Sequence, residues 1–260
     1  MLSREEGRTN DVFVASDAGK RPLLIMDSDT HNLVYTSMVL QRFEFKTHMA
    51  KTAQEAFDLA THTPPSLILT ALDLNDMQGI QLLQMIKKHP NTAEIPLIAM
   101  RKKDDLIKEQ SCLNAGAVNC LDKPVSAELL YRAVHKEIQK QPRSSMRIRT
   151  IQPVQVGTLS GGGSDAAHTL DLSERGMFLR TLKPAPESTR LAIRINLNGL
   201  IIAAEVVVVY NCLPNAGPYK ESGMGLEFTR IAPKDQELIR RFIGSEVLRG
   251  ILPENNATVS

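Results

Sequence analysis

The chain has 260 residues, a length that favours roughly two domains. Lys and Arg number 31 and Asp and Glu number 29, so the formal net charge is +2. This near balance excludes a bulk polycation that binds nucleic acid through charge alone. The chain is 42% hydrophobic and 23% charged, which is typical of folded domains. Aromatic residues make up only 4% and Trp is absent, which argues against a stacking platform for single-stranded nucleic acid.

The three cysteines, Cys112, Cys120 and Cys212, match neither a disulfide framework nor a zinc site, which favours a reducing compartment. The first residues carry acids and no apolar core, unlike a secretory signal. The longest apolar stretch, 200–210, is interrupted by Glu205 and is far shorter than the ~20 residues of a membrane helix. We therefore expect a cytoplasmic protein without membrane insertion.

Composition changes along the chain divide it into four segments. Residues 1–20 are polar with one short apolar patch, which predicts a mobile arm. Residues 21–140 alternate apolar runs with amphipathic stretches, and residues 141–252 are rich in extended runs separated by turn residues. Residues 253–260 form a polar tail. The sequence therefore predicts two domains and no internal repeat.

The first domain reads as five strand-then-helix units. Parallel strands need helical crossovers, so this alternation predicts an α/β domain with a doubly wound, five-stranded parallel sheet. The expected strands are Leu23–Met26, Phe45–Met49 (the weakest), Ser66–Thr70, Pro96–Met100 and Val118–Leu121. The expected helices lie near 30–42, 53–62, 79–88, 104–115 and 126–140.

The second domain reads as six short antiparallel strands followed by a helix, which predicts a six-stranded antiparallel β-barrel with a closing helix. Asn198-Gly199 between two β-rich runs is a strong hairpin signal. Gly161-Gly162-Gly163-Ser164 predicts a further turn and lacks the lysine of a phosphate-binding loop. The expected strands are Ile148–Val156, His168–Leu172, Met177–Thr181, Arg190–Asn196, Ile201–Tyr210 and Met224–Thr229. The helix begins at Pro233, and its apolar face comprises Leu238, Phe242, Ile243 and Val247.

Charged residues follow two strands of the expected parallel sheet. Asp27-Ser28-Asp29 comes after the first strand and Asp122-Lys123-Pro124 after the fifth. Ligands of such sheets bind at the carboxyl ends of the strands, and carboxylates that face a lysine suit Mg²⁺ and phosphoryl chemistry. Together with Ala115-Gly116-Ala117 and Met77-Gln78-Gly79, these motifs make residues 22–140 resemble the receiver domain of bacterial response regulators.

The departures from that resemblance are informative. The position of the family's phosphoacceptor aspartate falls on Ala71, which has no nucleophile. The second member of the acidic pair is Ser28, the switch Ser/Thr falls on Arg101, and the switch aromatic falls on Cys120. Asp73 lies two residues past the acceptor position. The resemblance thus implies a degenerate receiver domain, a pseudo-receiver, without a metal site.

One hypothesis places the Arg101 guanidinium among Asp27 and Asp29, where it would replace metal and phosphoryl group electrostatically. The alternative interpretation is that Arg101-Lys102-Lys103 is a solvated loop. The degenerate pocket then comprises Asp27, Ser28, Asp29, Ala71, Asp73, Arg101 and Lys123.

Two motifs mark the second domain: an RxxxR motif with Arg143 and Arg147, and a DxSxxG motif with Asp171, Ser173 and Gly176. Each alone is weak. Their order, the downstream run Gly223–Phe228 and the final helix make residues 142–248 resemble the PilZ domain. That resemblance implies binding of the bacterial second messenger cyclic di-GMP.

The residue types suit this ligand. A guanidinium group can pair with phosphate oxygens or with the O6/N7 edge of guanine, which fits Arg143 and Arg147. An ionised Asp171 accepts hydrogen bonds, as guanine N1–H and N2–H₂ require, Ser173 can donate or accept, and Gly176 permits a tight turn. The alternative is a capped turn beside a solvated basic linker.

We therefore expect a non-enzymatic cyclic di-GMP effector or adaptor of bacterial signalling, without a resident cofactor. Its pseudo-receiver would bind a protein partner of motility, polysaccharide or signalling machinery; DNA is not an expected partner, and homodimerisation stays open. Two alternatives remain: a two-component response regulator phosphorylated at Asp73 with the barrel as output, and a scaffolding adaptor that binds no ligand. No Ser/His/Asp or Cys/His set indicates an active site.

Overall fold

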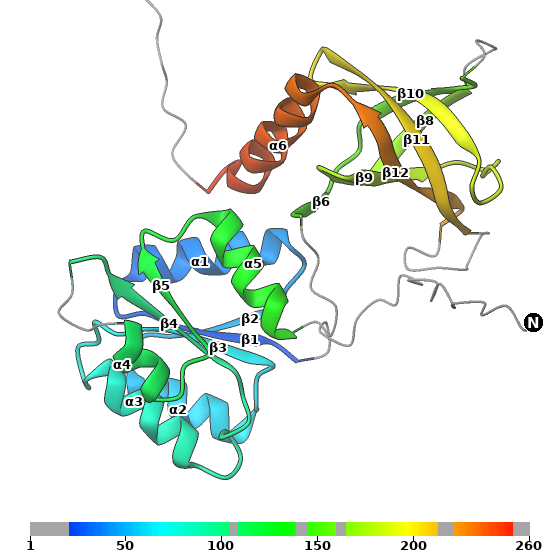
Figure 1. Cartoon of the computed structure of the whole chain (residues 1–260). Helices are drawn as coiled ribbons and strands as arrows, with labels where there is room; N and C mark the ends of the chain where they lie inside the picture. Colours follow the sequence, from blue (N-terminus) through cyan, green and yellow to red (C-terminus); the bar gives the residue numbers. More distant parts are fainter. Residues whose placement is uncertain (1–20, 105–108, 139–144, 160–164, 213–220, 252–260) are drawn as a thin grey trace, which may run out of the picture. The chain divides into compact units, whose positions relative to one another are not determined.

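The protein is represented by a computed structural model that describes residues 21–104, 109–138, 145–159, 165–212 and 221–251 (Figure 1). Among these, residues 151–171 and 176–232 form one compact unit, the barrel unit, and the remaining described residues form the other, the α/β unit.

The α/β unit contains a five-stranded parallel sheet in the order β2-β1-β3-β4-β5. Figure 1 shows helices on both faces, with α1 and α5 on one side and α2, α3 and α4 on the other. The doubly wound sheet predicted from the sequence is confirmed. The strands are β1 (Leu23–Met26), β2 (Thr47–Ala50), β3 (Leu67–Ala71), β4 (Leu97–Lys102) and β5 (Asn119–Lys123). The helices are α1 (Thr30–Arg42), α2 (Ala53–His62), α3 (Gly79–Lys88), α4 (Glu109–Asn114) and α5 (Ala127–Ile138).

The helix starts follow from local capping. Asp29 caps α1, because its side chain accepts hydrogen bonds from the backbone N–H groups of His31 and Asn32. Thr52 caps α2 in the same way through Glu55 N. Strands β1 and β3 are buried along their whole length, because helices cover both faces of a parallel sheet. This burial explains why they read as continuous apolar runs in the sequence.

Gly79 sets the start of α3. A Cβ atom built there would lie 2.4 Å from Leu72 Cα and 2.7 Å from Leu72 O, so only glycine allows this approach of α3 to the chain that leaves β3. The contact fixes the segment between the carboxyl end of β3 and α3.

Antiparallel strands form the barrel in the order β8-β7-β10-β11-β12-β9, and pairing of β8 with β9 closes the ring of six. Strand β6 adds to β8 outside the ring. The predicted six-stranded barrel is confirmed. The bounds are β6 (Arg147–Arg149), β7 (Pro153–Gly157), β8 (Asp165–Ser173), β9 (Gly176–Arg180), β10 (Arg190–Leu197), β11 (Leu200–Cys212) and β12 (Gly223–Ile231).

The predicted run Ile148–Val156 is two strands, β6 and β7, rather than one. The break falls at 150–152, immediately before Pro153, whose missing N–H and restricted neighbour interrupt strand pairing. The backbone groups of Gln152 are both satisfied by Thr169 of β8, since its N–H donates to Thr169 Oγ1 and its carbonyl accepts from Thr169 N.

The Asn198-Gly199 hairpin is confirmed. Leu197 pairs with Leu200, and the two loop residues have φ angles of 52° and 92°, which is the left-handed conformation that a tight hairpin turn needs. Gly199 N also donates to Asn196 Oδ1 at 2.7 Å. The other predicted glycine-rich turn, 161–164, lies outside the described residues.

Helix α6 (Pro233–Leu248) begins at the predicted proline, which suits the first helical position because its missing N–H has no partner there anyway. Its buried face comprises Ile239, Phe242, Ile243 and Val247, whereas Leu238 is only partly buried. Within the part of the chain that the structure describes, no helix is long and apolar enough to cross a membrane.

Candidate functional site

The carboxyl ends of β1, β3 and β5 bring together Asp27, Asp73 and Lys123. Lys123 Nζ lies 2.8 Å from Asp27 Oδ2 and 2.9 Å from Asp73 Oδ1. The side chain of Asp27 is 1% exposed and that of Lys123 is 11% exposed. One ammonium group therefore bridges two carboxylates, and the sequence motifs had indicated that Asp27 and Lys123 lie at neighbouring strand ends.

A second lysine completes this arrangement. Lys102 Nζ lies 3.0 Å from Asp73 Oδ2, so each oxygen of the Asp73 carboxylate contacts a different ammonium group. Burial alone would raise the pKa of Asp73, but the hydrogen bonds from Lys123 and Lys102 outweigh it, and the pKa lies below its ordinary value. Asp73 is therefore held as a carboxylate.

Arg101 does not take the place hypothesised for it beside Asp27 and Asp29. Its Nε donates to Asp122 Oδ1 at 2.7 Å. The register explains why: Arg101 pairs with Asp122 across β4 and β5, and Lys102 pairs with Lys123. Successive side chains of a strand point to opposite faces, so the face that carries both lysines excludes Arg101. Lys102 was not predicted as a pocket residue, because the strand expected from the sequence ended at Met100 and did not reach residue 102.

The side chains of Ser28 and Asp29 form hydrogen bonds around the loop that follows β1. Ser28 Oγ donates to Lys51 O at 3.3 Å and accepts from Asn75 N at 3.1 Å. Asp29 is the α1 cap described above, and the N–H groups of Asn32 and His31 lower the pKa of its carboxyl group. Asp29 N donates to Asp27 Oδ1 at 3.0 Å, which orients the buried carboxylate.

The predicted phosphoacceptor position is the last residue of β3. Ala71 is fully buried and offers only a methyl group at the strand end that faces Asp27 and Lys123. No group of three potential metal-ligating side chains occurs within the described ranges. Asp27 and Asp73 already contact lysines. Ser28 and Ala71 stand at the two positions where the resemblance to receiver domains would place further carboxylates. These residues do not fit a Mg²⁺ ion.

Cys120, at the switch-aromatic position, lies in β5 with its Sγ 3.3 Å from Cys112 Sγ. Burial and the contact with Cys112 raise the pKa of the Cys120 thiol to about 12. Neither cysteine is part of a disulfide bond. The two thiols therefore pack as small apolar side chains with the core of the α/β unit, and they react weakly.

The second motif lies where β8 turns into β9. Asp171 and Ser173 are in the last three residues of β8, with 6% and 2% of their surfaces exposed, and Gly176 begins β9. Ser173 Oγ accepts from Arg175 N at 3.4 Å, which closes the turn. Arg147 begins β6 and is partly buried. Arg143 lies outside the described residues.

Gly176 has a structural reason to be glycine. A Cβ atom there would lie 2.1 Å from Leu226 O and 3.2 Å from Glu227 Cα, so the backbone of β12 occupies the place of a side chain. Gly176 pairs with Glu227 in the β9–β12 ladder. The turn is thereby seated against the neighbouring strand.

Glu174, inside the turn, was not singled out from the sequence. Its carboxylate oxygens lie 3.1 and 3.2 Å from Arg240 Nε and Nη2 of α6. Its carbonyl accepts from Gln236 Nε2 at 3.3 Å. A sequence separation of more than 60 residues leaves no local pattern that could have indicated this contact.

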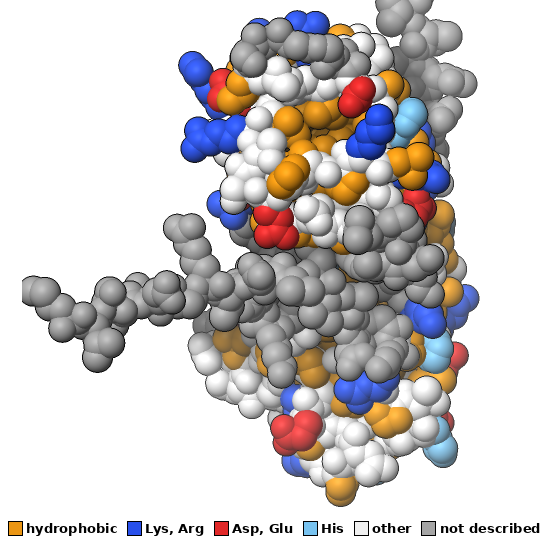
Figure 2. All heavy atoms as spheres, turned by 90° about the vertical axis from the view of Figure 1, so that its right-hand side faces the viewer, with side chains coloured by type: hydrophobic (Ala, Val, Ile, Leu, Met, Phe, Trp, Pro, Cys, Tyr) orange, Lys and Arg blue, Asp and Glu red, His pale blue; other side chains and the backbone are white. Residues whose placement is uncertain are grey.

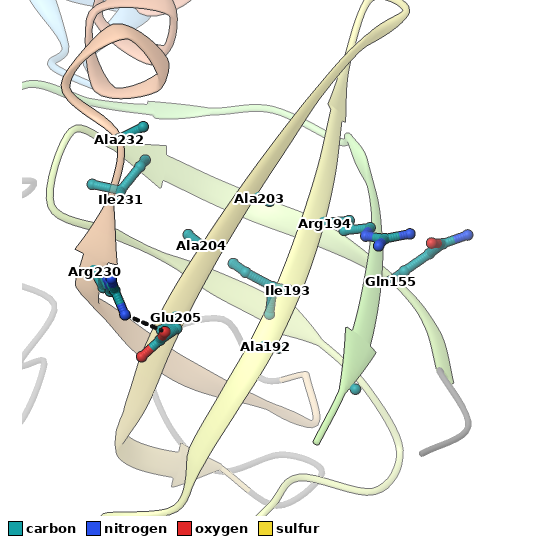
Figure 3. Close-up of a pocket in the computed structure, with 11 residues that line it drawn as sticks. Gln155, Ala192, Ile193, Arg194, Ala203, Ala204, Glu205, Arg230, Ile231 and Ala232 are labelled. Atoms are coloured by element: carbon teal, nitrogen blue, oxygen red, sulfur yellow. Dashed lines mark hydrogen bonds and ion pairs between the residues drawn. The ribbon is translucent and has the colours of Figure 1, made fainter. Parts of the chain in front are cut away.

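The barrel also carries a hollow of about 760 Å³ on β7, β10, β11 and β12 (Figure 3). Its lining includes the small residues Gly157, Ala192 and Ala203, and Arg230 lies 3.5 Å from Glu205 at its edge. None of the predicted nucleotide-binding residues that the structure describes, namely Arg147, Asp171, Ser173 and Gly176, lines it. Figure 2 shows apolar side chains gathered on one face of the barrel, within a ring of charged groups.

Comparison with protein-family models agrees with both halves of this description. Residues 23–135 match the model of the response regulator receiver domain, and residues 140–245 match the model of the PilZ domain.

Curated relatives match over the receiver-like half. A "Probable cyclic di-GMP phosphodiesterase" of Vibrio cholerae is 29% identical over 125 residues, which are 48% of this chain and 28% of that protein. The "Transcriptional regulatory protein SrrA" of Staphylococcus aureus is 31% identical over 104 residues, 40% of this chain and 42% of that protein. The chain thus spans less than half the length of these relatives.

Among solved structures, a CheY-like response regulator receiver domain protein from Methanospirillum hungatei is 27% identical, with a TM-score of 0.43. It covers 45% of this chain and 93% of its own length. A two-component response regulator from Clostridium difficile is 24% identical, with a TM-score of 0.43, over 46% of this chain and 97% of its own.

Proposed function

Because the chain joins a response regulator receiver domain to a PilZ domain, we propose that it is a cyclic di-GMP effector whose receiver domain works without phosphorylation. Receiver and PilZ domains are non-catalytic modules, and their combination supports a role in cyclic di-GMP signalling. The observation that carries the proposal is the intact DxSxxG turn at the β8–β9 junction, with Arg147 in the strand that pairs with β8.

The chemistry of that turn supports a guanine nucleotide as ligand. Asp171 supplies a carboxylate and Ser173 a hydroxyl at the end of one strand, in a turn that Gly176 seats against β12. A carboxylate accepts from guanine N1–H and N2–H₂, and the arginines of the RxxxR motif supply planar donors for phosphate oxygens and guanine O6/N7. Arg143 and Arg147 are the proposed partners of the phosphates and bases.

The receiver pocket supports regulation without phosphoryl transfer. An acyl phosphate needs a carboxylate at the acceptor position, and Ala71 has none. Lys123 and Lys102 contact the carboxylates of Asp27 and Asp73. We propose that this receiver domain binds a protein partner of the motility, polysaccharide or signalling machinery in one fixed state.

Calorimetric titration with cyclic di-GMP tests the proposal. Saturable binding by the wild type, lost in Arg143→Ala/Arg147→Ala and in Asp171→Ala, is the expected result. Arg194→Ala is the matched control, because Arg194 is an exposed arginine of β10 that lines the separate barrel hollow. Binding that survives the double substitution and fails in Arg194→Ala would move the site to the hollow and overturn the assignment.

A further inference from the structure

We propose that Arg240 of α6 is a positioning residue for the nucleotide-binding turn, and that nucleotide binding is thereby coupled to the start of α6. This inference rests on the proposed function, since it concerns the same turn. Helix α6 contacts Glu174, which follows Ser173 directly in the chain.

The contact between Arg240 and Glu174 is a bidentate ion pair. Arg240 Nε and Nη2 reach separate oxygens of the Glu174 carboxylate, at 3.1 and 3.2 Å. A guanidinium fork matched to a carboxylate fixes orientation as well as distance, which a single ammonium contact cannot do. The Glu174 side chain is 17% exposed and that of Arg240 is 47% exposed, so the carboxylate is shielded from water while the guanidinium group is half exposed.

A second contact holds the turn from the same helix. Gln236 Nε2 donates to the Glu174 carbonyl at 3.3 Å, one helical turn before Arg240. Glu237 holds the guanidinium in turn, because its Oε2 lies 2.6 Å from Arg240 Nη1. The first two turns of α6 therefore contact both the side chain and the backbone of Glu174.

Other contacts also restrain the turn between β8 and β9. Strand β8 ends at Ser173 and β9 begins at Gly176, so Glu174 and Arg175 form the whole connection. Gly176 lies against the β12 backbone, and Ser173 Oγ accepts from Arg175 N. We infer that the Arg240 contact helps to set the direction of Ser173 Oγ before the ligand arrives, which lowers the ordering cost of binding. Loss of this contact removes the side-chain tie between Glu174 and α6 and leaves only the carbonyl contact with Gln236 among the described contacts of Glu174 with that helix.

Coupling of this kind acts in both directions. If α6 positions the turn for the nucleotide, a bound nucleotide must strengthen the hold of the turn on α6. Amide hydrogens near Gln236 and Arg240 are therefore expected to exchange more slowly when cyclic di-GMP is bound.

The experiment uses the full chain and compares wild type, Arg240→Ala, Arg240→Lys and Arg241→Ala by calorimetry with cyclic di-GMP. We expect Arg240→Ala to weaken binding about threefold to tenfold and Arg240→Lys to recover part of the loss. Arg241→Ala is the matched control: its guanidinium contacts Glu237 alone among the ion pairs of the described residues, and its side chain is 75% exposed. It should bind like the wild type.

Two further measurements separate positioning from loss of folding. Glu174→Gln breaks the same ion pair from the other side and is expected to weaken binding to a similar extent. Hydrogen exchange of residues 233–241 should slow on adding nucleotide in the wild type and not in Arg240→Ala.

The outcomes separate the two proposals. A wild type that does not bind cyclic di-GMP overturns the proposed function and this inference with it. A wild type that binds, with Arg240→Ala and Glu174→Gln binding equally well, overturns the inference alone. Equal protection of α6 in wild type and Arg240→Ala also overturns it.

Discussion

The ammonium group of Lys123 lies 2.8 Å from Asp27 Oδ2, and both side chains are almost fully withdrawn from solvent. The pair is an ion contact without aligned hydrogen-bond geometry at this oxygen. Among the described residues, Lys123 is the cation that contacts Asp27, and removing one partner of a buried ion pair is costly because it leaves a buried charge uncompensated. This pair therefore links the ends of β1 and β5, and the contact of Lys123 with Asp73 adds the end of β3.

Lys123→Met should destabilise the protein by about 3–5 kcal/mol, because it leaves Asp27 charged and buried. Adding Asp27→Asn should recover much of the loss, since the unpaired charge is then gone. Urea unfolding curves measure both. Lys103→Ala, an exposed lysine of the adjacent loop, is the control and should stay within about 0.5 kcal/mol of wild type. An equally unstable double variant would contradict this account.

The stability of the protein should fall in acid partly because of Asp73. Its folded-state pKa lies below the ordinary value of 3.8, so its contribution is present above that value and is lost as pH falls through the lower folded-state pKa. Asp73→Asn should be less stable than wild type at pH above 3.8, and the difference should shrink below it. Urea midpoints across this range give the measurement, with the exposed Asp104→Asn as control. A difference that does not change with pH would refute the assignment.

Phosphoryl donors should leave the receiver domain unmodified. Ala71 offers no acceptor, and Asp73 already contacts Lys102 and Lys123. Intact-mass measurement after incubation with acetyl phosphate and Mg²⁺ is expected to show no added phosphoryl group. Beryllium fluoride should likewise fail to bind saturably. A phosphoryl adduct that disappears in Asp73→Ala would favour the phosphorylated response regulator instead.

Two glycine-to-alanine substitutions should have opposite effects. Gly176→Ala forces a methyl group into the β12 backbone, 2.1 Å from Leu226 O, and should cost about 1–3 kcal/mol or more, with loss of nucleotide binding. At Gly244, inside α6, an added Cβ meets nothing within 4 Å, so Gly244→Ala should stabilise by roughly 0.5–1 kcal/mol. Thermal unfolding tests the pair. A tolerated Gly176→Ala would show that the turn is not seated as described.

Cys120 should react slowly with thiol reagents in the folded protein. Burial and the nearby Cys112 raise its pKa to about 12, so the reactive thiolate is rare near neutral pH. Alkylation by iodoacetamide, followed by peptide mass mapping, should label Cys120 quickly only in denaturant. Rapid labelling of the folded protein would contradict the raised pKa of this partly buried thiol.

Much of this fold could be predicted because its signals are local. Helices α1, α2 and α3 match the residue ranges expected from amphipathic spacing, and the Asn198-Gly199 turn follows from its φ requirements. The ends of strands were less predictable. Strand β4 continues to Lys102, which turns Arg101 away from the pocket, and Pro153 splits one expected strand into two.

Most long-range side-chain contacts could not be predicted. Asp27 and Lys123 are the exception: they could be placed near each other because ligands bind at the carboxyl ends of the strands of a parallel sheet. No comparable rule joins Glu174 to Arg240 or Lys102 to Asp73, because these contacts depend on register and helix placement.

The proposed function requires that the turn after β8 and the arginines of the RxxxR motif recognise the guanine base. Parallel calorimetric titrations of the wild-type protein with cyclic di-GMP and cyclic di-AMP test it most directly. Adenine lacks the O6 acceptor and the N2–H₂ donor that Arg143, Arg147 and Asp171 are assigned to contact. We predict saturable binding of cyclic di-GMP and none of cyclic di-AMP at the same concentrations. Absence of binding to cyclic di-GMP, or equal binding of both nucleotides, would contradict the account.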